Sequence, residues 1–257
     1  MTHGIATISV IPLRKEPSHR SEQVSQLLFG ETYEVIEKKG NKWIQIRCNY
    51  DGYEGWMDEA SYHAIYEKEY AQLTESPAAV ALDVVSTATS EKQGIPILCG
   101  SNLPFFDGIN FRLHKEKFIY NGQAIQDGQQ NNSHLEKIAF RFLNAPYLWG
   151  GRSPFGIDCS GFTQIVFKYL FIPLLRDAYQ QAEQGIVVNF VEETQPGDLA
   201  FFVNDEDRIT HVGIVLKDQQ IIHASGKVRI DRLDHFGIFN VDRKKYSHKL
   251  KIIKRVL

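Results

Sequence analysis

Over its first sixty or so residues the chain shows short runs of alternating hydrophobic and polar positions separated by turn signals, a pattern typical of small β-strands. The alternation is clearest in residues 43–47, and Asp51-Gly52 is a strong hairpin signal before residues 53–57. Further strands are predicted over residues 6–10, 26–29 and 32–37, with residues 12–17 as an irregular loop. This succession of strands predicts a small barrel.

A second group of short hydrophobic runs follows a polar stretch, residues 66–76, which we interpret as a linker. Residues 78–125 are predicted to form a second small β unit. Its strands are expected at residues 80–84, 95–98, 111–114 and 117–120, with a turn at residues 121–122. Residues 126–132 are poor in hydrophobic side chains and rich in Gln and Asn, which is typical of a domain boundary.

Beyond this boundary the hydrophobic spacing changes to that of helices. Residues 135–143 predict an amphipathic helix with Ser133 as its N-cap, and residues 159–171 predict a second helix with one buried face. A short polar helix is expected over residues 176–184, ended by Gly185. Strands are then predicted at residues 190–191, 199–203, 211–216, 220–224 and 250–256. Helices followed by a meander of strands indicate an α+β fold.

Composition limits the class of protein. The chain has 257 residues, 43% hydrophobic and 23% charged, with a formal net charge of −2, so nothing in its overall charge favours nucleic acid or a membrane surface as a partner. It lacks an apolar run of membrane-spanning length, and its start lacks the features of a signal peptide. We expect a cytoplasmic protein, or a periplasmic or secreted one if the sequence is a processed form. The three cysteines Cys48, Cys99 and Cys159 suit neither a disulfide framework nor a CxxC metal site.

Candidate chemistry is concentrated in the glycine-rich stretch 147–162, which leads into the helix predicted from residue 159. Asp158 is the expected N-cap, so Cys159 would lie in the first turn. There the helix dipole and free backbone N–H groups favour a thiolate, the reactive form of cysteine. The alternative is a buried, unreactive cysteine at a helix start.

A catalytic cysteine needs a base, and His211 and His223 are the histidines best placed to serve. Each lies in one of two successive predicted strands. Antiparallel pairing of these strands would bring the two imidazoles onto one face. The spacing does not say how near they lie to Cys159, and a histidine at a strand end is more often a surface residue.

Four blocks of the third region resemble the NlpC/p60 family of papain-like cell-wall cysteine peptidases. They are the nucleophile block with Tyr147-x-Trp149-Gly-Gly and Asp158-Cys159-Ser160-Gly161-Phe162, Gln195-Pro-Gly-Asp-Leu-Ala-Phe-Phe202, His211-Val-Gly-Ile-Val215, and Ile222-His223-Ala-Ser225. The resemblance covers residues 133–257. One block alone would be weak, but four in order and spacing make an accidental match very improbable.

The resemblance implies roles for the site residues. Cys159 would be the nucleophile and His211 the general base, oriented by His223. The Cys159 backbone N–H and the Tyr147 hydroxyl would stabilise the oxyanion. Asp158 creates a tension, because its charge disfavours a neighbouring thiolate. Either the imidazolium and the helix dipole outweigh it, or it faces a substrate amine.

The first region resembles a bacterial SH3-like domain in the spacing of Trp43, the Asp51-Gly52 turn and Trp56, and the second resembles a degenerate copy. Together the parts resemble the γ-D-glutamyl-L-diamino acid endopeptidases of murein-peptide recycling. The implied domains are residues 1–70 and 71–130, both SH3-like, and 131–257, the papain-like peptidase. In that group the first domain blocks one end of the cleft, so that only peptides with a free L-alanine amine enter.

The same resemblance suggests substrate-binding residues. A tyrosine and a carboxylate of the first domain would bind the amine, with Tyr53 and Glu22 as candidates and Glu54 as a rival to Glu22. Ala178 replaces a family serine, so one expected hydroxyl contact to the D-glutamyl group is missing. The remaining substrate-binding candidates are Trp149, Asp158, Ser160, Arg176 and Asp177.

The family needs no metal or organic cofactor, and the expected partner is a small murein peptide rather than nucleic acid or membrane. The oligomeric state and the choice between lysine and diaminopimelate stay open. Three other functions are compatible with the pattern: a hydrolase of intact wall using the SH3-like domains as anchors, a non-catalytic binding module, and an acyltransferase. The binding module is disfavoured because Cys159, His211 and His223 are all present.

Overall fold

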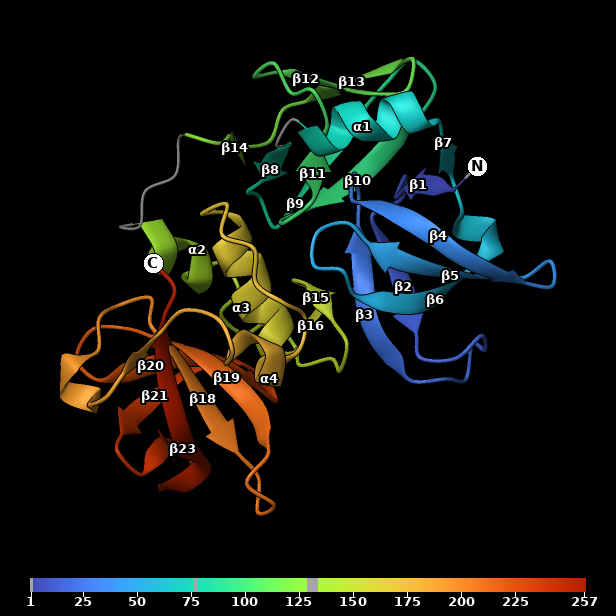
Figure 1. Ribbon diagram of the computed structural model, residues 1–257. Helices are drawn as coiled ribbons and strands as arrows, with labels where there is room; N and C mark the ends of the chain where they lie inside the picture. Colours follow the sequence, from blue (N-terminus) through green and yellow to red (C-terminus); the bar gives the residue numbers. More distant parts are fainter. Residues whose placement is uncertain (1, 76–77, 129–133) are drawn as a thin grey trace. The chain divides into compact units, whose positions relative to one another are not determined.

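The computed structural model describes residues 2–75, 78–128 and 134–257 (Figure 1). The chain divides into two compact units: residues 1–130 with 149–154, and residues 131–148 with 155–257. Unit 1 therefore contains both predicted β regions and, in addition, a short segment from the nucleophile block. The boundary predicted at residues 126–132 lies partly outside the described residues, as does the predicted N-cap Ser133.

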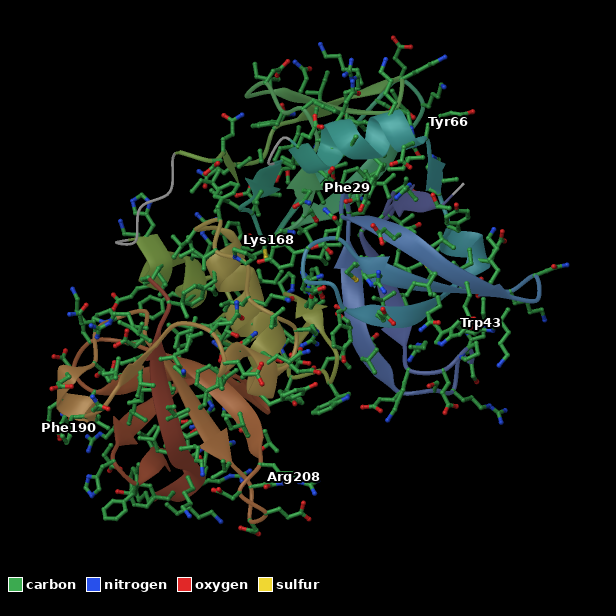
Figure 2. All side chains as sticks on the ribbon, in the orientation of Figure 1. Phe29, Trp43, Tyr66, Lys168, Phe190 and Arg208 are labelled. Carbon is green, nitrogen blue, oxygen red and sulfur yellow. The ribbon has the colours of Figure 1, made fainter. Side chains whose placement is uncertain are left out.

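The first part of unit 1 is one antiparallel sheet in the order β3-β2-β6-β5-β4-β1-β7. Its interior is a cluster of buried side chains that includes Ile11, Leu27, Ile44 and Met57. Trp56 is buried, whereas Trp43, labelled in Figure 2, is half-buried at the start of β5. The strands are β1 (His3–Ile5), β2 (Val10–Arg14), β3 (Gln23–Leu28), β4 (Thr32–Lys39), β5 (Trp43–Cys48), β6 (Glu54–Asp58) and β7 (Ala64–Ile65), with the short helix η1 (Glu59–Ser61).

Two predictions for this part, the strand at residues 6–10 and the loop at residues 12–17, are wrong. The first strand was expected at residues 6–10, but that segment mostly connects β1 to β2, and β2 runs through the predicted loop. Its Pro12 is exposed between the buried Ile11 and Leu13, so the strand keeps its alternation despite the proline. The predicted linker at residues 66–76 contains a helix, α1 (Glu67–Glu75), none of whose residues is fully buried. Tyr70 of this helix stacks on His3, with 3.9 Å between ring centroids.

The second part of unit 1 has a four-stranded sheet, β10-β9-β13-β12, and a three-stranded sheet, β11-β8-β14. Its core includes Phe111 and Phe118, whose rings are stacked with 5.1 Å between their centroids. Ile5, Phe29 and Ile65 of the first part belong to the same hydrophobic cluster, so the two β regions share one core. The strands are β8 (Ala79–Ala81), β9 (Val85–Thr89), β10 (Gly94–Leu98), β11 (Asn102–Leu103), β12 (Asn110–Leu113), β13 (Glu116–Tyr120) and β14 (Ala124–Ile125), and β15 (Arg152–Ser153) also belongs to unit 1.

Unit 2 combines helices with a sheet that closes on itself. The sheet order is β17-β23-β18-β19-β20-β21-β22, and β22 also pairs with β23. The helix α3 packs against β19 and β20, as seen in Figure 1. The elements are α2 (Leu135–Phe140), β16 (Gly156–Ile157), α3 (Cys159–Lys168), α4 (Ala178–Gln181), β17 (Ile186–Val188), η3 (Val191–Glu193), β18 (Leu199–Val203), β19 (Ile209–Val215), β20 (Gln220–Ser225), β21 (Lys227–Asp234), β22 (Gly237–Asn240) and β23 (Lys245–Arg255).

The predicted α+β class is confirmed, with local corrections. Residues 190–191 are not a strand: Val191 begins η3 instead. The strands β21 and β22 were not predicted, although β21 has eight residues. The helix α3 is buried along its whole length rather than on one face. Among the residues that the structure describes, none of the helices is long and apolar enough to cross a membrane.

Candidate active site

Cys159 is the first residue of α3. Asp158 precedes it as the N-cap, and its side chain accepts a hydrogen bond of 2.7 Å from the backbone N–H of Gly161, as the sequence predicts. The Cys159 thiol lies 4.0 Å from the carbonyl oxygen of Thr210 on β19. Burial, together with the charge of Asp158, raises the pKa of this thiol to about 12. The resting thiol is therefore protonated and needs a base to become a nucleophile.

The charge of Asp158 has a buried partner. Arg176 donates to both oxygens of this carboxylate, at 3.1 Å and 2.6 Å, and to the Ser160 hydroxyl at 2.9 Å. All three residues are at least 95% buried. The Arg176 guanidinium also lowers the pKa of Cys159, which opposes the effect of Asp158. The ion pair next to the nucleophile thus offsets part of the tension seen in the sequence.

The register of β19, β20 and β21 brings the two predicted histidines together. His223 pairs with Gly213 on β19, so His211, two residues before Gly213, lies on the same face. The Nε2 atom of His211 and the Nδ1 atom of His223 are 2.8 Å apart. A Cβ on Gly213 would lie 2.7 Å from Cδ1 of Ile221 and 2.9 Å from the Cβ of His223. Glycine at this position therefore leaves the room that His223 occupies.

A buried carboxylate lies behind the histidine pair. His223 pairs with Arg229 across β20 and β21, and Asp231 is two residues further along the same face. The Nε2 atom of His223 lies 3.0 Å from Oδ2 of Asp231, and neither side chain has any exposed surface. Arg229 and the backbone N–H of Val241 also donate to Asp231. The site thus continues from His211 through His223 to Asp231.

His248 on β23 adds a third imidazole, stacked on His211 with 4.1 Å between ring centroids. Burial, then the neighbouring His223, lowers the pKa of His248 to about 4, so its ring is neutral near pH 7. Ligand nitrogens of His211, His223 and His248 lie within 4.8 Å of one another, the one such group among the described residues. Because the lone pairs lie in the ring planes, two nearly parallel rings do not converge well on one metal ion.

Tyr147 is half-buried and lies near Cys159 and Asp158, which interact electrostatically with its phenol. Burial, then these two neighbours, raises the pKa of its phenol. The hydroxyl therefore keeps its proton at neutral pH and remains a hydrogen-bond donor. Its backbone N–H donates to the carbonyl of Gly226, which attaches Tyr147 to the turn between β20 and β21.

The segment predicted to bind a D-glutamyl group has structural roles of its own. Arg176 donates hydrogen bonds to Asp158 and Ser160, as described above. Asp177 is the N-cap residue of α4. The backbone N–H of Asp177 donates to the Gln180 side chain at 3.0 Å. Ala178, in place of the family serine, is buried.

The candidates from the amino-terminal region lie in unit 1, and so does Trp149. The indole N–H of Trp149 donates to Glu22 at 2.7 Å, which brings two predicted substrate-binding residues together. Tyr53 lies in the turn before β6, where its backbone N–H donates to Asp51. Glu54, the rival carboxylate, is paired with Arg47 at 2.8 Å.

Residues 149–154 are held in unit 1 by a buried ion pair that sequence reasoning missed. Arg152 donates to both oxygens of Glu31, at 2.8 Å and 3.0 Å, and to the carbonyl of Gln26. Arg152 and Glu31 are 1% and 2% exposed. Gly150 has a φ of 72°, and a Cβ there would lie 2.4 Å from the carbonyl oxygen of Gln23. Only glycine suits both this backbone conformation and this close approach.

Asp231, Arg229 and His248 were also missed. An Arg and an Asp two residues apart in a strand share a face, so Arg229 and Asp231 could have been recognised as a pair had β21 been predicted. No local pattern marks His248, since its ring partners Phe202, His211 and His223 come from three other strands.

Comparison with known proteins gives two family matches. Residues 144–244 match the model described as the NlpC/P60 family, and residues 13–61 match the bacterial dipeptidyl-peptidase Sh3 domain. A protein of Bacillus cereus named γ-D-glutamyl-L-lysine dipeptidyl-peptidase is 31% identical over 229 residues, 78% of this chain and 66% of the relative. The protein of the same name from Bacillus subtilis is 30% identical over 221 residues, 78% of this chain and 71% of the relative. The chain thus spans about two thirds of the length of these relatives.

Solved structures show the same fold. A crystal structure of an NlpC/P60 family protein from Bacillus cereus aligns over all of both chains, with a TM-score of 0.83 and 22% identity. An NlpC/P60 endopeptidase of Photobacterium damselae aligns over 98% of this chain and 70% of its own, with a TM-score of 0.72 and 18% identity. The predicted combination of an SH3-like region with a papain-like domain is confirmed.

Proposed function

The chain belongs to the NlpC/P60 family, and we propose that it is a cysteine peptidase that cleaves the bond between γ-D-glutamate and a diamino acid in murein peptides. The observation that carries the proposal is the position of Cys159 at the start of a buried helix, with its thiol against the strand that supplies His211. The hydrogen-bonded His211 and His223 support the same reaction class.

In the proposed reaction, the nitrogen of His211 that does not face His223 takes the thiol proton as the sulfur of Cys159 attacks the amide carbonyl. The backbone N–H of Cys159 and the Tyr147 hydroxyl donate to the oxyanion. His211 then returns the proton to the leaving amine, and a thioester to the D-glutamyl carbonyl remains. Water, activated by the same histidine, releases the acid and restores the thiol.

Substrate choice is the finer part of the proposal. Two relatives are named for a γ-D-glutamyl-L-lysine bond, which supports a diamino acid after the scissile bond, either lysine or diaminopimelate. We propose that Glu22, held by Trp149, binds the free amine of an N-terminal L-alanine, with Tyr53 as a second contact. This requirement would suit peptides already released from the sugar strands, and hence the recycling of wall peptides in the cytoplasm.

The test is incubation with L-Ala-γ-D-Glu-diaminopimelate and with its lysine analogue, followed by mass spectrometry. Release of L-Ala-D-Glu is expected, while peptides acetylated at the alanine amine should be cut at least about tenfold more slowly. Cys159→Ala should abolish release and change stability by about 1 kcal/mol or less. Release at the wild-type rate by this variant would refute the proposal. Cleavage of intact sacculi in preference to free peptides would instead favour a hydrolase of the assembled wall.

A further inference from the structure

We propose that Asp231 is a positioning residue that fixes the tautomers of His223 and His211, and so keeps the second nitrogen of His211 unprotonated for the Cys159 thiol. The inference rests on the proposed function, since it explains how His211 is prepared to act as a base. It goes beyond that proposal because it adds a residue to the proton path and gives it one defined task.

The first step is the charge state of Asp231. Its carboxylate accepts from Nε of Arg229 at 2.7 Å, from Nη2 of Arg229 at 2.9 Å and from the backbone N–H of Val241 at 3.0 Å. Burial alone would raise the pKa of Asp231, but hydrogen bonds from His223, Arg229 and Val241 outweigh it and lower the pKa to about 2. The group is therefore ionised at neutral pH, and an ionised carboxylate only accepts hydrogen bonds.

The second step is the tautomer of His223. Because Asp231 cannot donate, the contact of 3.0 Å between its Oδ2 and the Nε2 of His223 requires the proton to be on Nε2. Burial lowers the pKa of His223 despite Asp231, so the ring is neutral and holds one proton. Its Nδ1 is then a bare acceptor.

The third step transmits the constraint to His211. The contact of 2.8 Å between Nδ1 of His223 and Nε2 of His211 now requires His211 to donate from Nε2. Burial, then His223 and His248, lowers the pKa of His211 well below its ordinary value, so this ring also holds one proton. Its Nδ1 carries a free lone pair, which is what a general base needs. Without Asp231 the opposite arrangement, with Nδ1 of His211 protonated, would satisfy the histidine pair equally well.

The decisive variant is Asp231→Asn, which keeps the shape and removes the charge. Oδ1 accepts from two donors, Nη2 of Arg229 and the backbone N–H of Val241, so the amide oxygen is expected to take this place. The amide NH₂ then takes the place of Oδ2, where it faces His223 and displaces Nε of Arg229. His223 must then accept at Nε2 and carry its proton on Nδ1, which forces His211 to protonate the nitrogen needed for catalysis. In a serine peptidase triad the corresponding change costs about 10⁴-fold in kcat. Asp231 lies one imidazole ring further from the nucleophile than the aspartate of that triad. We therefore expect a loss of at least about 100-fold in kcat, with KM within about threefold of wild type.

The matched control is Asp242→Asn. Asp242 also accepts from Nη2 of Arg229, at 2.9 Å, but its side chain is exposed. This variant removes the same charge beside the same arginine, and its kcat should stay within about twofold of wild type. A loss equal to that of Asp231→Asn would assign the effect to Arg229 and overturn the proposal.

Testing Asp231→Asn in a second variant background distinguishes a positioning role of Asp231 from a role in folding. If Asp231 acts through the tautomer of His223, Asp231→Asn should cost less than about threefold in a His223→Asn background, because there is no ring left to orient. An equal loss in both backgrounds would mean a general structural role and would refute the inference. Cys159→Ala tests the proposed function separately: if it is inactive while Asp231→Asn is fully active, only the inference fails.

One measurement does not depend on any variant folding or on any substrate. Two-bond ¹H–¹⁵N spectra of wild-type protein with labelled histidine distinguish the two neutral tautomers of each ring. His211 and His223 should both carry the proton on Nε2 at pH 7. A proton on Nδ1 of either ring would overturn the proposal.

Discussion

Replacing Arg176 by methionine tests whether the buried ion pair beside Cys159 stabilises both the fold and the nucleophile. Arg176→Met leaves the Asp158 carboxylate 5% exposed with its guanidinium partner gone, although the Gly161 N–H still donates to it. Two unit charges about 4 Å apart interact by about 4 kcal/mol at an effective dielectric constant of about 20. Breaking a buried pair on one side typically costs about 3–5 kcal/mol. We expect about 3 kcal/mol, because the hydrogen bonds from the Gly161 N–H and the Ser160 hydroxyl to the carboxylate survive.

Two assays read out this variant. Calorimetry should show the melting temperature of unit 2 falling by roughly 10 °C. Alkylation of Cys159 by iodoacetamide at pH 8 should become slower, because Arg176 lowers the pKa of the thiol and its loss raises that pKa further. The double variant Asp158→Asn with Arg176→Met should recover much of the stability, since no charge is then left buried.

The control for Arg176→Met is Arg47→Met. Arg47 pairs with Glu54 at 2.8 Å, compared with 2.6 Å between Arg176 and Asp158, but the Arg47 side chain is 50% exposed. Exposed pairs contribute at most about 1 kcal/mol, so this change should alter stability little and leave the alkylation rate unchanged. If Arg176→Met costs no more stability than Arg47→Met, burial of the pair is not what matters and the reasoning fails.

Three further changes address other parts of the molecule. Gly213→Ala should lower kcat in single-turnover assays by pushing His223 away, and an unchanged rate would contradict the packing argument. His248→Phe should remove a loss of stability between pH 6.5 and about 4, because the unfolded chain binds the proton at the ordinary pKa of 6.5 while the folded chain does so only at about 4. Urea unfolding at pH 7 and pH 4.5 checks this, and equal losses in both proteins would contradict it. Glu31→Gln should destabilise unit 1 by about 3–5 kcal/mol in urea, since Arg152 would stay buried beside a neutral partner, and a cost below about 1 kcal/mol would contradict this.

The parts of the site that sequence reasoning predicted correctly depend on local rules. An Asp before a cysteine and a helical pattern predicts an N-cap, and Asp158 has that role. Two alternating strands joined by a short turn place His211 and His223 on one face, and the structure pairs them. Such rules involve residues within one turn or one hairpin, so they can be applied to a single amino-acid sequence.

The parts that were missed depend on segments meeting from a distance. Arg152 and Glu31 are 121 positions apart, and neither has a neighbour in the sequence that predicts a buried pair. Residues 66–76, which contain α1, are interpreted as a linker because the stretch is polar, and its own sequence does not predict the stacking of Tyr70 on His3. Tertiary contacts override local preference at these places.

Two buried carboxylates affect the nucleophile and its base: Asp158, which the sequence already places beside Cys159, and Asp231, which only the structure reveals. Asp158 alone would disfavour the Cys159 thiolate, and Arg176 offsets part of this effect. Asp231 does not reach the thiol, yet its charge dictates where the protons of two imidazoles lie. In a site where burial keeps both thiol and imidazole neutral, the proton on each nitrogen matters more than net charge. The chain from Asp231 to His211 is therefore where a conservative substitution should have its largest effect on rate and its smallest effect on shape.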